Sequence, residues 1–456
     1  MTDIARQVAK HYPGRTYQDI ARRDGDDLPP VLQAQSNPPQ PTGDIAFARY
    51  TSRDFFDLEM DKMWTKVWQF ACREEHLPEI GDYYVYDIGR YSVLIVRAEA
   101  GLRAYYNSCL HRGTKLKPSG ASGYSAFLQC PFHGWEWNLD GSLRHIPCDW
   151  EFPHIDRAKA CLPQARVEAW NGFVFICMDP SAPALRDYLE VLPEHFQRWD
   201  LTGWYVHTHI QKRLPGNWKL SLEAFMEGYH TPLVHPEMSK VLGDWNFQHD
   251  IFSDHVSRDL CPMASPSPTS NEDPTEQELL DRMLVGDRSL VGERRLVPEG
   301  KTARWVMAQQ VRDLMKQQYG LDYDHYSVPE LIDSIKYNVF PNLLIFPAAG
   351  FPLVQTFRPA GHDQDNSLFD LMILRPKPRD GVVDVAEPVL LGENDSYTQV
   401  PGLDPFLALV LDQDTDIMRW QREGMYTSKK GAESLSVYQE SRIRHLHQTL
   451  DKYLNR

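Results

Sequence analysis

The spacing of hydrophobic and polar residues divides the chain into segments of different character. Residues 1–44 are polar and rich in Pro, Gln and Asp, and they predict an arm with one short helix over residues 4–12. Apolar side chains recur at helical spacing in residues 51–68, which predicts a helix there. Between residues 81 and 177 short β-type runs alternate with turn residues. This texture predicts a small all-β domain.

The rest of the chain mixes helical and strand patterns, and its clearest elements fall into two groups. The β domain is predicted to contain strands over residues 82–88, 92–97, 102–107, 127–129 and 170–178. Further along, helices are predicted over residues 218–230 and 405–424, and strands of one antiparallel sheet over residues 337–346, 353–357 and 367–374. The pattern therefore predicts an α+β fold in which an all-β domain precedes a larger mixed domain.

Composition and charge exclude several classes of protein. The chain has 456 residues with 48 Lys and Arg against 63 Asp and Glu, a formal net charge of −15. This charge argues against a nucleic-acid partner. No run of about 18 apolar residues predicts a membrane-spanning helix, and no secretory signal is evident. Seven cysteines without such a signal indicate a reducing, cytoplasmic location, in which clustered cysteines more often bind metal than form disulfides.

Two Cys-His pairs form the first candidate site. Cys109 and His111 are two residues apart, and Cys130 and His133 are three residues apart after a gap of 18 residues. Two turns side by side would bring two thiolates and two imidazoles together. Zinc would take all four ligands tetrahedrally. A Rieske-type [2Fe–2S] cluster would place both cysteines on one iron and both histidines on the other.

The sequence around these pairs resembles a known family. Residues 107–113 (NSCLHRG) and 130–135 (CPFHGW) resemble the cluster-binding loops of Rieske non-haem iron, or ring-hydroxylating, oxygenases, and residues 81–97 resemble the segment upstream of them. The resemblance implies that a [2Fe–2S] cluster is bound by Cys109, His111, Cys130 and His133.

A second histidine pair lies in the pattern E-x2-H-x4-H. Glu227 and His230 are three residues apart, so a continuous helix would place them on one face. His235 would lie about 140° away on that helix. Pro232 disfavours continuation of the helix, so His235 can return to the same metal from the next turn. Two imidazoles and one carboxylate are the ligand set of non-haem Fe(II) oxygenases.

The carboxylate is expected from the helix predicted over residues 405–424. Its apolar stripe is made by Leu407, Val410, Leu411, Ile417 and Met418. Asp414 falls on this stripe, whereas Asp412 and Asp416 are each about 160° away and face outward. A lone buried carboxylate is costly unless a partner such as a metal compensates its charge. An Asp hydrogen-bonded to another residue is the alternative.

The family resemblance adds roles to these residues. It implies that Asp414, within residues 411–418, completes an iron site with His230 and His235. It also implies that Glu227 bridges His230 to a cluster histidine of the neighbouring subunit, although most members have Asp there. Ala224 stands where many members have Asn, which makes the pocket drier.

The resemblance also implies the architecture and the activity. We expect an N-terminal arm over residues 1–44 that packs on the catalytic domain, a Rieske domain over residues 45–165, and a catalytic domain over residues 166–456 with a central antiparallel sheet flanked by helices. The chain would be the catalytic alpha subunit of a homotrimer, to which some family members add a separate beta subunit. A ferredoxin or flavin reductase would supply electrons, because no dinucleotide-binding motif occurs.

The expected reaction is cis-dihydroxylation or monohydroxylation of an apolar aromatic or cyclic substrate with O2, and oxidative N- or O-demethylation is the alternative. A Rieske electron carrier or a zinc-stabilised binding module are alternatives of other classes; zinc is colourless and a Rieske cluster is red-brown. The candidate pocket residues are Phe340, Leu343, Leu344, Phe346, Phe351 and Leu353. His207 with His209 is predicted to be a surface pair, and His445 with His447 a solvated helix face.

Overall fold

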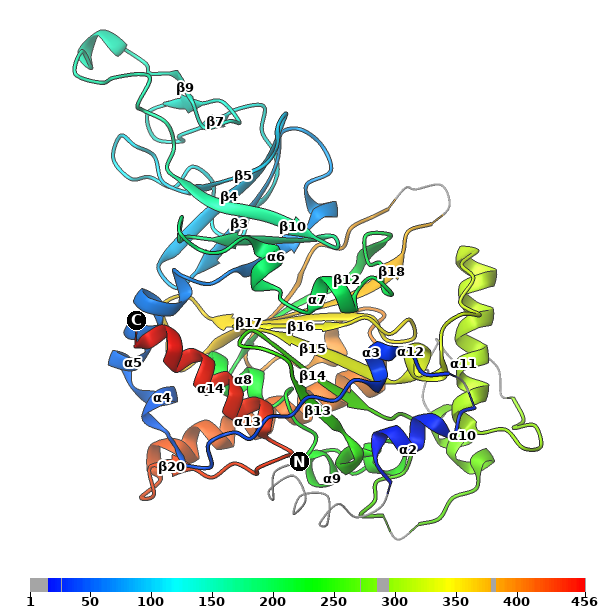
Figure 1. Cartoon of the computed structure of the whole chain (residues 1–456). Coiled ribbons are helices and arrows are strands. Elements are labelled where there is room, and N and C mark those ends of the chain that lie inside the picture. Colours follow the sequence, from blue (N-terminus) through cyan, green and yellow to red (C-terminus); the bar gives the residue numbers. More distant parts are fainter. Residues whose placement is uncertain (1–14, 26, 271, 285–294, 379–382, 456) are drawn as a thin grey trace. The chain divides into compact units, whose positions relative to one another are not determined.

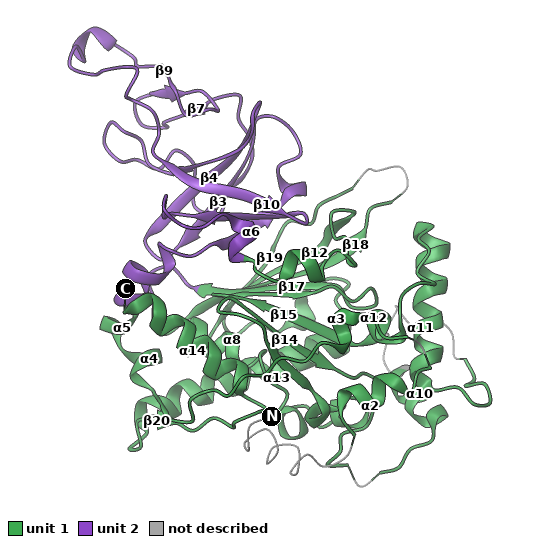
Figure 2. Cartoon of the chain, viewed as in Figure 1, with its two compact units in different colours: residues 1–56, 189–358, 364–455 green, residues 57–188, 359–363, 456 purple. Residues whose placement is uncertain are grey.

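The computed structural model describes residues 15–25, 27–270, 272–284, 295–378 and 383–455 (Figure 1). The helix predicted over residues 4–12 lies outside these residues. The chain forms two compact units (Figure 2). Unit 2 comprises Asp57–Tyr188 and Pro359–Asp363, and unit 1 comprises the described parts of Met1–Phe56, Leu189–Arg358 and Gln364–Asn455.

Unit 2 consists mainly of antiparallel strands. Seven strands form a sheet in the order β2-β11-β10-β5-β4-β3-β6, and three form a small sheet in the order β7-β8-β9. The strands are β2 (Gln69–Arg73), β3 (Asp82–Ile88), β4 (Tyr91–Ala98), β5 (Gly101–Tyr106), β6 (Ser122–Tyr124), β7 (Leu128–Gln129), β8 (Glu136–Trp137), β9 (Leu143–His145), β10 (Gln164–Trp170) and β11 (Phe173–Cys177). The short helical turns are η1 (Met60–Trp64), η2 (Glu74–His76), η3 (Asp149–Glu151) and α6 (Leu185–Tyr188). Unit 2 continues past residue 165 because β11 pairs with both β10 and β2.

The core of unit 2 surrounds the two cysteine loops. Leu94 and Val96 of β4 and Trp137 of β8 are buried together with Cys109 and Cys130. Each of these side chains is less than 5 % exposed. The thiols therefore lie in a dry environment held by both sheets of the unit.

Unit 1 contains the antiparallel sheet that the sequence predicts. Its strand order is β13-β14-β15-β16-β17-β18-β12-β19. The strands are β12 (Trp204–Leu214), β13 (Gln248–Ile251), β14 (Val256–Cys261), β15 (Ser334–Val339), β16 (Leu343–Phe346), β17 (Leu353–Pro359), β18 (Ser367–Pro376) and β19 (Val389–Leu391), and a separate pair joins β1 (Ile45–Ala46) to β20 (Ala432–Glu433). β19 runs parallel to its neighbour, β12. Residues 337–346 form parts of two strands rather than one, because Pro341 has no N–H for a central strand.

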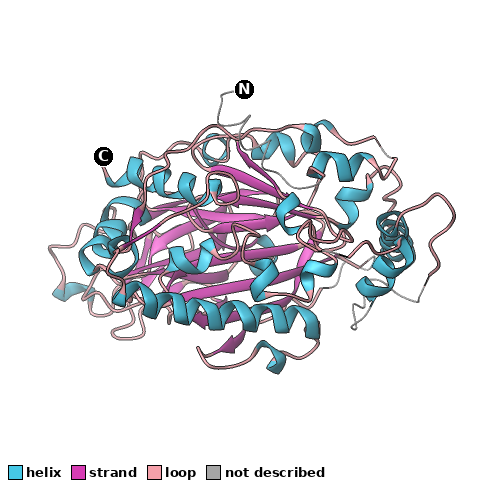
Figure 3. Cartoon of the chain, turned by 90° about the horizontal axis from the view of Figure 1, so that it is seen from below, coloured by secondary structure: helices cyan, strands magenta, loops and turns pink. Residues whose placement is uncertain are grey.

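Helices lie over this sheet and along its margins (Figure 3). They are α2 (Tyr17–Arg22), α3 (Pro30–Gln33), α4 (Ala48–Thr51), α5 (Arg53–Glu59, which continues into unit 2), α7 (Leu192–His195), α8 (Trp218–Glu223), α9 (Thr231–Val234), η4 (Met238–Lys240), η5 (Asp244–Asn246), α10 (Glu276–Leu284), α11 (Ala303–Leu314), η6 (Met315–Tyr319), α12 (Val328–Ile332), η7 (Tyr397–Gln399), α13 (Pro405–Thr427) and α14 (Ser441–Leu454). Within the described ranges, no helix is both long enough and apolar enough to cross a membrane.

Three predicted helices differ from the observed ones. The helix predicted over residues 51–68 is α5 followed by the π-helical turn η1. α8 ends at Glu223 instead of residue 230. α13 passes through Gly424, where the sequence predicts its end, and stops at Thr427. A glycine inside a helix costs only about 1 kcal/mol, so the packing of a 23-residue helix outweighs it.

The described part of the N-terminal arm packs on unit 1. The Tyr17 hydroxyl donates to Asp333 at 3.1 Å, and the Gln18 side-chain amide donates to that of Gln248 at 2.8 Å. The backbone N–H of Ser36 donates to the carboxylate of Asp250 at 2.9 Å. These contacts tie the described part of the arm to the edge strand β13 and to Asp333, which directly precedes β15.

Candidate metal centres

Two histidines and one aspartate converge in unit 1. The Nε2 atom of His230 is 3.6 Å from Oδ1 of Asp414, and Nε2 of His235 is 2.9 Å from the same oxygen. Ligand atoms of all three residues lie within 4.8 Å of one another. The structure therefore brings together the three residues that the sequence predicts as iron ligands.

The two histidines flank a single helical turn. α8 begins after its N-cap residue Asn217, but the chain leaves the helix before Glu227. The short helix α9 then starts directly after His230 with Pro232 in its first turn, and His235 follows its last residue. The turn thus returns His235 toward His230, and the two ring centroids are 5.3 Å apart.

Glu227 contacts His230 through a turn, not through a helix face. One carboxylate oxygen accepts from His230 Nδ1 at 2.5 Å. The other accepts from the backbone N–H groups of His230, at 3.2 Å, and of Tyr229. The predicted continuous helix is wrong here, and Glu227 reaches His230 because its carboxylate closes this turn.

The two imidazoles are oriented by groups at their Nδ1 atoms. Gln413 accepts from Nδ1 of His235 at 2.7 Å, and Glu227 accepts from Nδ1 of His230. Both rings therefore carry a proton on Nδ1 and turn Nε2 toward Asp414. Sequence reasoning missed Gln413; its position next to Asp414 was the available signal.

Asp414 occupies the buried side of α13. The Asp404 side chain caps this helix by accepting the N–H of Leu407 at 2.8 Å. Asp414 is 6 % exposed, whereas Asp416 is exposed. Asp412 does not face freely outward: its carboxylate accepts from the Ser396 hydroxyl at 2.5 Å. Ile417, predicted on the apolar stripe, is 37 % exposed.

The electrostatics of this cluster favour a cation. Burial lowers the pKa of His230, but Glu227 and Asp414 outweigh it and raise the pKa to about 9. Burial raises the pKa of Glu227, and the contact with His230 more than reverses this, so its pKa lies below its ordinary value. Negative charge therefore dominates at the point where the three ligand atoms meet. Two imidazoles, one carboxylate and this potential fit ferrous iron with open coordination positions.

A cavity of about 310 Å³ adjoins the three residues. Its lining is mostly Met, Leu, Val and Phe side chains, and of the predicted pocket residues it includes Phe346, Phe351 and Leu353. Phe340, Leu343 and Leu344 are buried elsewhere and do not line it. Two buried polar atoms of the lining, Oε1 of Gln355 and Oδ2 of Asp404, have no hydrogen-bond partner among the described residues.

The two Cys-His loops of unit 2 have the same construction. The N–H of Gly113 donates to the carbonyl of Cys109 at 2.9 Å, and the N–H of Gly134 donates to that of Cys130 at 3.1 Å. Both glycines adopt positive φ, 77° and 71°, which favours glycine. A glycine four residues after each cysteine was therefore a signal that the spacing argument did not use.

The donor set of these loops fits a [2Fe–2S] cluster. The thiols of Cys109 and Cys130 are neighbours, and the rings of His111 and His133 are 4.7 Å apart. Nδ1 of His111 is buried without a partner among the described residues, as expected of an atom that serves as a ligand. The backbone N–H of His111 donates to the Cys109 sulfur at 3.4 Å, a bond that tunes cluster potential.

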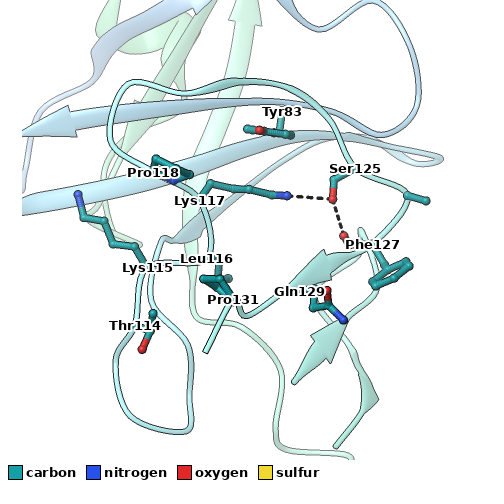
Figure 4. Close-up of a pocket in the computed structure, with 11 residues that line it drawn as sticks. Tyr83, Thr114, Lys115, Leu116, Lys117, Pro118, Ser125, Phe127, Gln129 and Pro131 are labelled. Atoms are coloured by element: carbon teal, nitrogen blue, oxygen red, sulfur yellow. Dashed lines mark hydrogen bonds between the residues drawn. The ribbon is translucent and has the colours of Figure 1, made fainter. Parts of the chain in front are cut away.

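A larger cavity of about 520 Å³ lies beside these loops (Figure 4). Lys117 Nζ donates to the Ser125 hydroxyl at 3.0 Å, and this hydroxyl donates to the Phe127 carbonyl at 2.6 Å. Lys117 Nζ also lies against the face of the Tyr83 ring, 4.6 Å from the ring centroid. Neither the two cysteines nor the two histidines line this cavity.

Two predictions about the other histidines are wrong. His447 is 3 % exposed because it lies on the buried side of α14, where Arg49 donates to its Nδ1 at 2.9 Å. Its Nε2 consequently donates to Glu223 at 2.9 Å, in a network that also includes the Tyr50 hydroxyl. His209 of β12 is likewise buried, with 2 % of its surface exposed.

The carboxylates that bind these histidines are themselves buried. Burial raises the pKa values of Glu223 and Glu433, which meet at the Tyr50 hydroxyl. His209 contacts Asp370 at 3.0 Å. Burial opposes ionisation of Asp370, but Arg358 and His209 hold its pKa well below the ordinary value. Glu223 and Asp370 thus each belong to a hydrogen-bonded network within unit 1.

Comparison with known proteins now identifies the family. Residues 67–156 match the sequence model of the Rieske [2Fe-2S] domain. Residues 196–456, more than half of the chain, match the model of the ring hydroxylating alpha subunit (catalytic domain). The chain belongs to the ring hydroxylating alpha subunit family. As a Rieske oxygenase alpha subunit it has a Rieske [2Fe–2S] domain and a mononuclear iron catalytic domain, as the sequence predicts.

Curated relatives of this alpha subunit include both monooxygenases and a dioxygenase. The chain is 31 % identical over 198 residues to the glycine betaine monooxygenase oxygenase subunit of Pseudomonas aeruginosa. The aligned region covers 43 % of this chain and 46 % of the relative. It is 32 % identical over 227 residues to the carnitine monooxygenase oxygenase subunit of Escherichia coli, covering 46 % and 60 %. It is 33 % identical over 199 residues to the anthranilate 1,2-dioxygenase large subunit of Acinetobacter baylyi, covering 42 % of each. The matches thus span 42 % to 60 % of these relatives' lengths.

Solved structures show the same fold. A quaternary ammonium Rieske monooxygenase in complex with L-carnitine superposes with a TM-score of 0.63 at 18 % identity, over 90 % of this chain and 95 % of the other. A naphthalene 1,2-dioxygenase variant bound to phenanthrene gives a TM-score of 0.63 at 16 % identity, over 92 % and 94 %. At this low sequence identity, the two superpositions show a shared fold alone.

Proposed function

We propose that this chain is the terminal oxygenase of a multicomponent enzyme that uses O2 and electrons from a partner protein to hydroxylate a small apolar aromatic or cyclic substrate. The observation that carries the proposal is the cluster of His230, His235 and Asp414 beside a mainly apolar cavity, in a chain that also has a Rieske domain. An electron carrier without chemistry of its own needs no such cavity.

The residues of unit 2 would hold the electron-transfer group. Cys109 and Cys130 would bind one iron of the [2Fe–2S] cluster, and His111 and His133 the other. When bound, the cluster supplies electrons one at a time. The protein's own contribution is a dry environment for the thiols and N–H donation to the Cys109 sulfur.

The residues of unit 1 would hold mononuclear iron and substrate. His230, His235 and Asp414 would coordinate ferrous iron, which supplies the activation of O2. Glu227 fixes the tautomer of His230, and we assign it the bridge to a cluster histidine of the neighbouring subunit. The apolar lining of the cavity excludes water from the substrate.

The proposed partners follow from the family and from the sequence, which has no dinucleotide-binding motif. A ferredoxin or a flavin reductase would reduce the cluster, and the electron would then cross to the iron of an adjacent subunit in a homotrimer. A separate beta subunit and a cytoplasmic location stay predictions. Sedimentation of the purified chain, with and without co-expressed partners, measures the assembly directly.

We expect the purified chain to contain about two inorganic sulfides and about three irons. His230→Ala should lower the iron content by about one per chain and leave sulfide and the red-brown absorption unchanged, because the two centres use different ligands. Iron and sulfide analysis with visible spectroscopy measures both. Zinc in place of sulfide in the unaltered chain, or loss of the chromophore in folded His230→Ala protein, would contradict the assignment.

A panel of substrates tests the proposed reaction. Neutral aromatic and cyclic hydrocarbons should give hydroxylated products, detected by mass spectrometry, when the chain is combined with a reductase, NADH and O2. Oxidative demethylation is the second candidate, and it would release formaldehyde from N-methyl or O-methyl compounds. The observation that favours it is Asp404, a lining residue whose carboxylate has one oxygen without a hydrogen-bond partner among the described residues; its negative charge can attract a cationic methylammonium group.

Asp404→Asn distinguishes a neutral from a cationic substrate. Asparagine retains the oxygen that caps α13 but removes the negative charge. We expect KM for a neutral substrate to change by less than about twofold. A cationic substrate would lose a buried charge partner and its KM would rise at least about tenfold. Steady-state kinetics on panel compounds of both kinds therefore separates the two functions.

A further inference from the structure

The segment that presents Glu227 is held by side chains from elements far away in sequence. After α8 ends, the carbonyls of Phe225 and Met226 have no partner in a continuing helix. Lys336 Nζ donates to the Phe225 carbonyl, and Arg442 Nη1 donates to the Met226 carbonyl at 3.0 Å. The two residues immediately before Glu227 are thus bound by two cationic side chains.

Asp259 joins these two cations. Its carboxylate accepts from Arg442 and lies 3.2 Å from Lys336 Nζ. Asp259 and Lys336 are direct cross-strand partners on β14 and β15, and Arg442 is in the first turn of α14. Asp259 and Arg442 are fully buried, and Lys336 is 7 % exposed. We call Lys336, Asp259 and Arg442 the carbonyl clamp.

Stability alone does not account for this arrangement. Buried ion groups often contribute no more stability than apolar residues of the same volume would, because desolvation offsets their attraction. One donor of Arg442, Nη2, and one acceptor of Asp259, Oδ1, also have no partner among the described residues. The clamp does, however, fix two consecutive carbonyls beside Glu227, and directional bonds to rigid elements are what precise placement of a ligand requires.

We propose that Lys336, Asp259 and Arg442 are positioning residues that hold Glu227 and His230 in the geometry needed for electron transfer to the iron. This inference rests on the proposed function. The clamp acts through the backbone: it sets the turn at residues 225–227, which sets the Glu227 carboxylate, which in turn orients the ring of His230. Lys336 also lines the cavity, whereas Arg442 and Asp259 do not, so Arg442 gives the cleaner test.

Arg442→Met removes the bond to the Met226 carbonyl and leaves Asp259 paired with Lys336, so no buried charge is stranded. We expect cluster and iron contents close to those of the unaltered protein. The electron paramagnetic resonance signal of the nitric oxide adduct of its ferrous iron should broaden or shift, since the iron ligands lose their fixed orientation. Reoxidation of the reduced cluster, with O2 and a panel compound that the unaltered protein hydroxylates, should slow about 10- to 100-fold. KM should change less than kcat.

Arg258→Met is the matched control. Arg258 is also fully buried and pairs with an aspartate, Asp250, at 2.6 Å, but its hydrogen bonds go to other parts of unit 1. Its loss should lower Tm without altering the nitric oxide signal or the reoxidation rate. Arg442→Lys, which keeps the charge, should recover part of the rate.

Asp259→Asn provides a second measurement if Arg442→Met does not fold, because asparagine keeps the shape and one acceptor oxygen. Like Arg442→Met, this variant should reoxidise its reduced cluster more slowly than the unaltered protein. A reoxidation rate and nitric oxide signal like those of the unaltered protein, in Arg442→Met or in Asp259→Asn, would overturn the clamp. Absence of a nitric oxide signal in the unaltered protein would instead overturn the proposed iron site, so the two failures are distinct.

Discussion

Asp414→Ala is expected to abolish hydroxylation, with turnover falling more than about a hundredfold. Asp414 is the only carboxylate among the described residues that lies within ligand distance of both His230 and His235. Loss of a group that merely orients a ligand already costs about 10- to 100-fold, so loss of a ligand should cost more. Iron analysis and product formation measure the effect, and cluster absorption should be unchanged.

Asp416→Ala is the control for this change. Asp416 is two residues further along α13, is exposed and pairs with Arg419 at the surface at 3.2 Å. Surface pairs of this kind contribute about 0–1 kcal/mol, so iron content and turnover should stay near those of the unaltered protein. An active, iron-loaded Asp414→Ala variant would show that another residue supplies the carboxylate.

Glu227→Gln is expected to leave both metal centres assembled but to slow electron transfer between them. In the structure both carboxylate oxygens accept hydrogen bonds, from Nδ1 of His230 and from the N–H groups of Tyr229 and His230. Glutamine offers one accepting oxygen, so its NH2 group would face a donor and one of these bonds would be lost. Reoxidation of the reduced cluster in single turnover should slow at least about tenfold.

Glu227→Asp is the conservative comparison. It keeps two accepting oxygens and, by the family resemblance, most members carry aspartate at this position, so it should retain much more of the rate than the glutamine variant. Stopped-flow absorbance of the cluster measures both variants under the same conditions. If the glutamine variant reoxidises as fast as the unaltered protein, Glu227 is not the bridge and serves only to close the turn before His230.

The sequence by itself determined the chemistry of the candidate centres. The order of Cys109, His111, Cys130 and His133, and the glycine turns around them, are local features, because each turn is closed by hydrogen bonds within about six residues. The phase of Asp414 on α13 is also local, since helical periodicity alone separates it from Asp416. The family, the α+β class and the antiparallel sheet follow from the same kind of pattern.

The tertiary structure decided how the histidines are presented. Helical periodicity predicts a continuous helix through His230, but α8 ends at Glu223. Beyond that end the backbone has non-local partners: Lys336 and Arg442, more than a hundred residues away, donate to the carbonyls of Phe225 and Met226. No pattern within residues 217–235 contains that information.

Burial of polar side chains was likewise settled only by packing. His447 and His209 follow polar patterns in sequence, yet both are buried because acids from distant segments, Glu223 and Asp370, compensate them. Gln413, which the sequence pattern does not single out, orients His235. A sequence pattern reports which side chains can form a core, whereas a buried polar group depends on a partner that the fold brings to it.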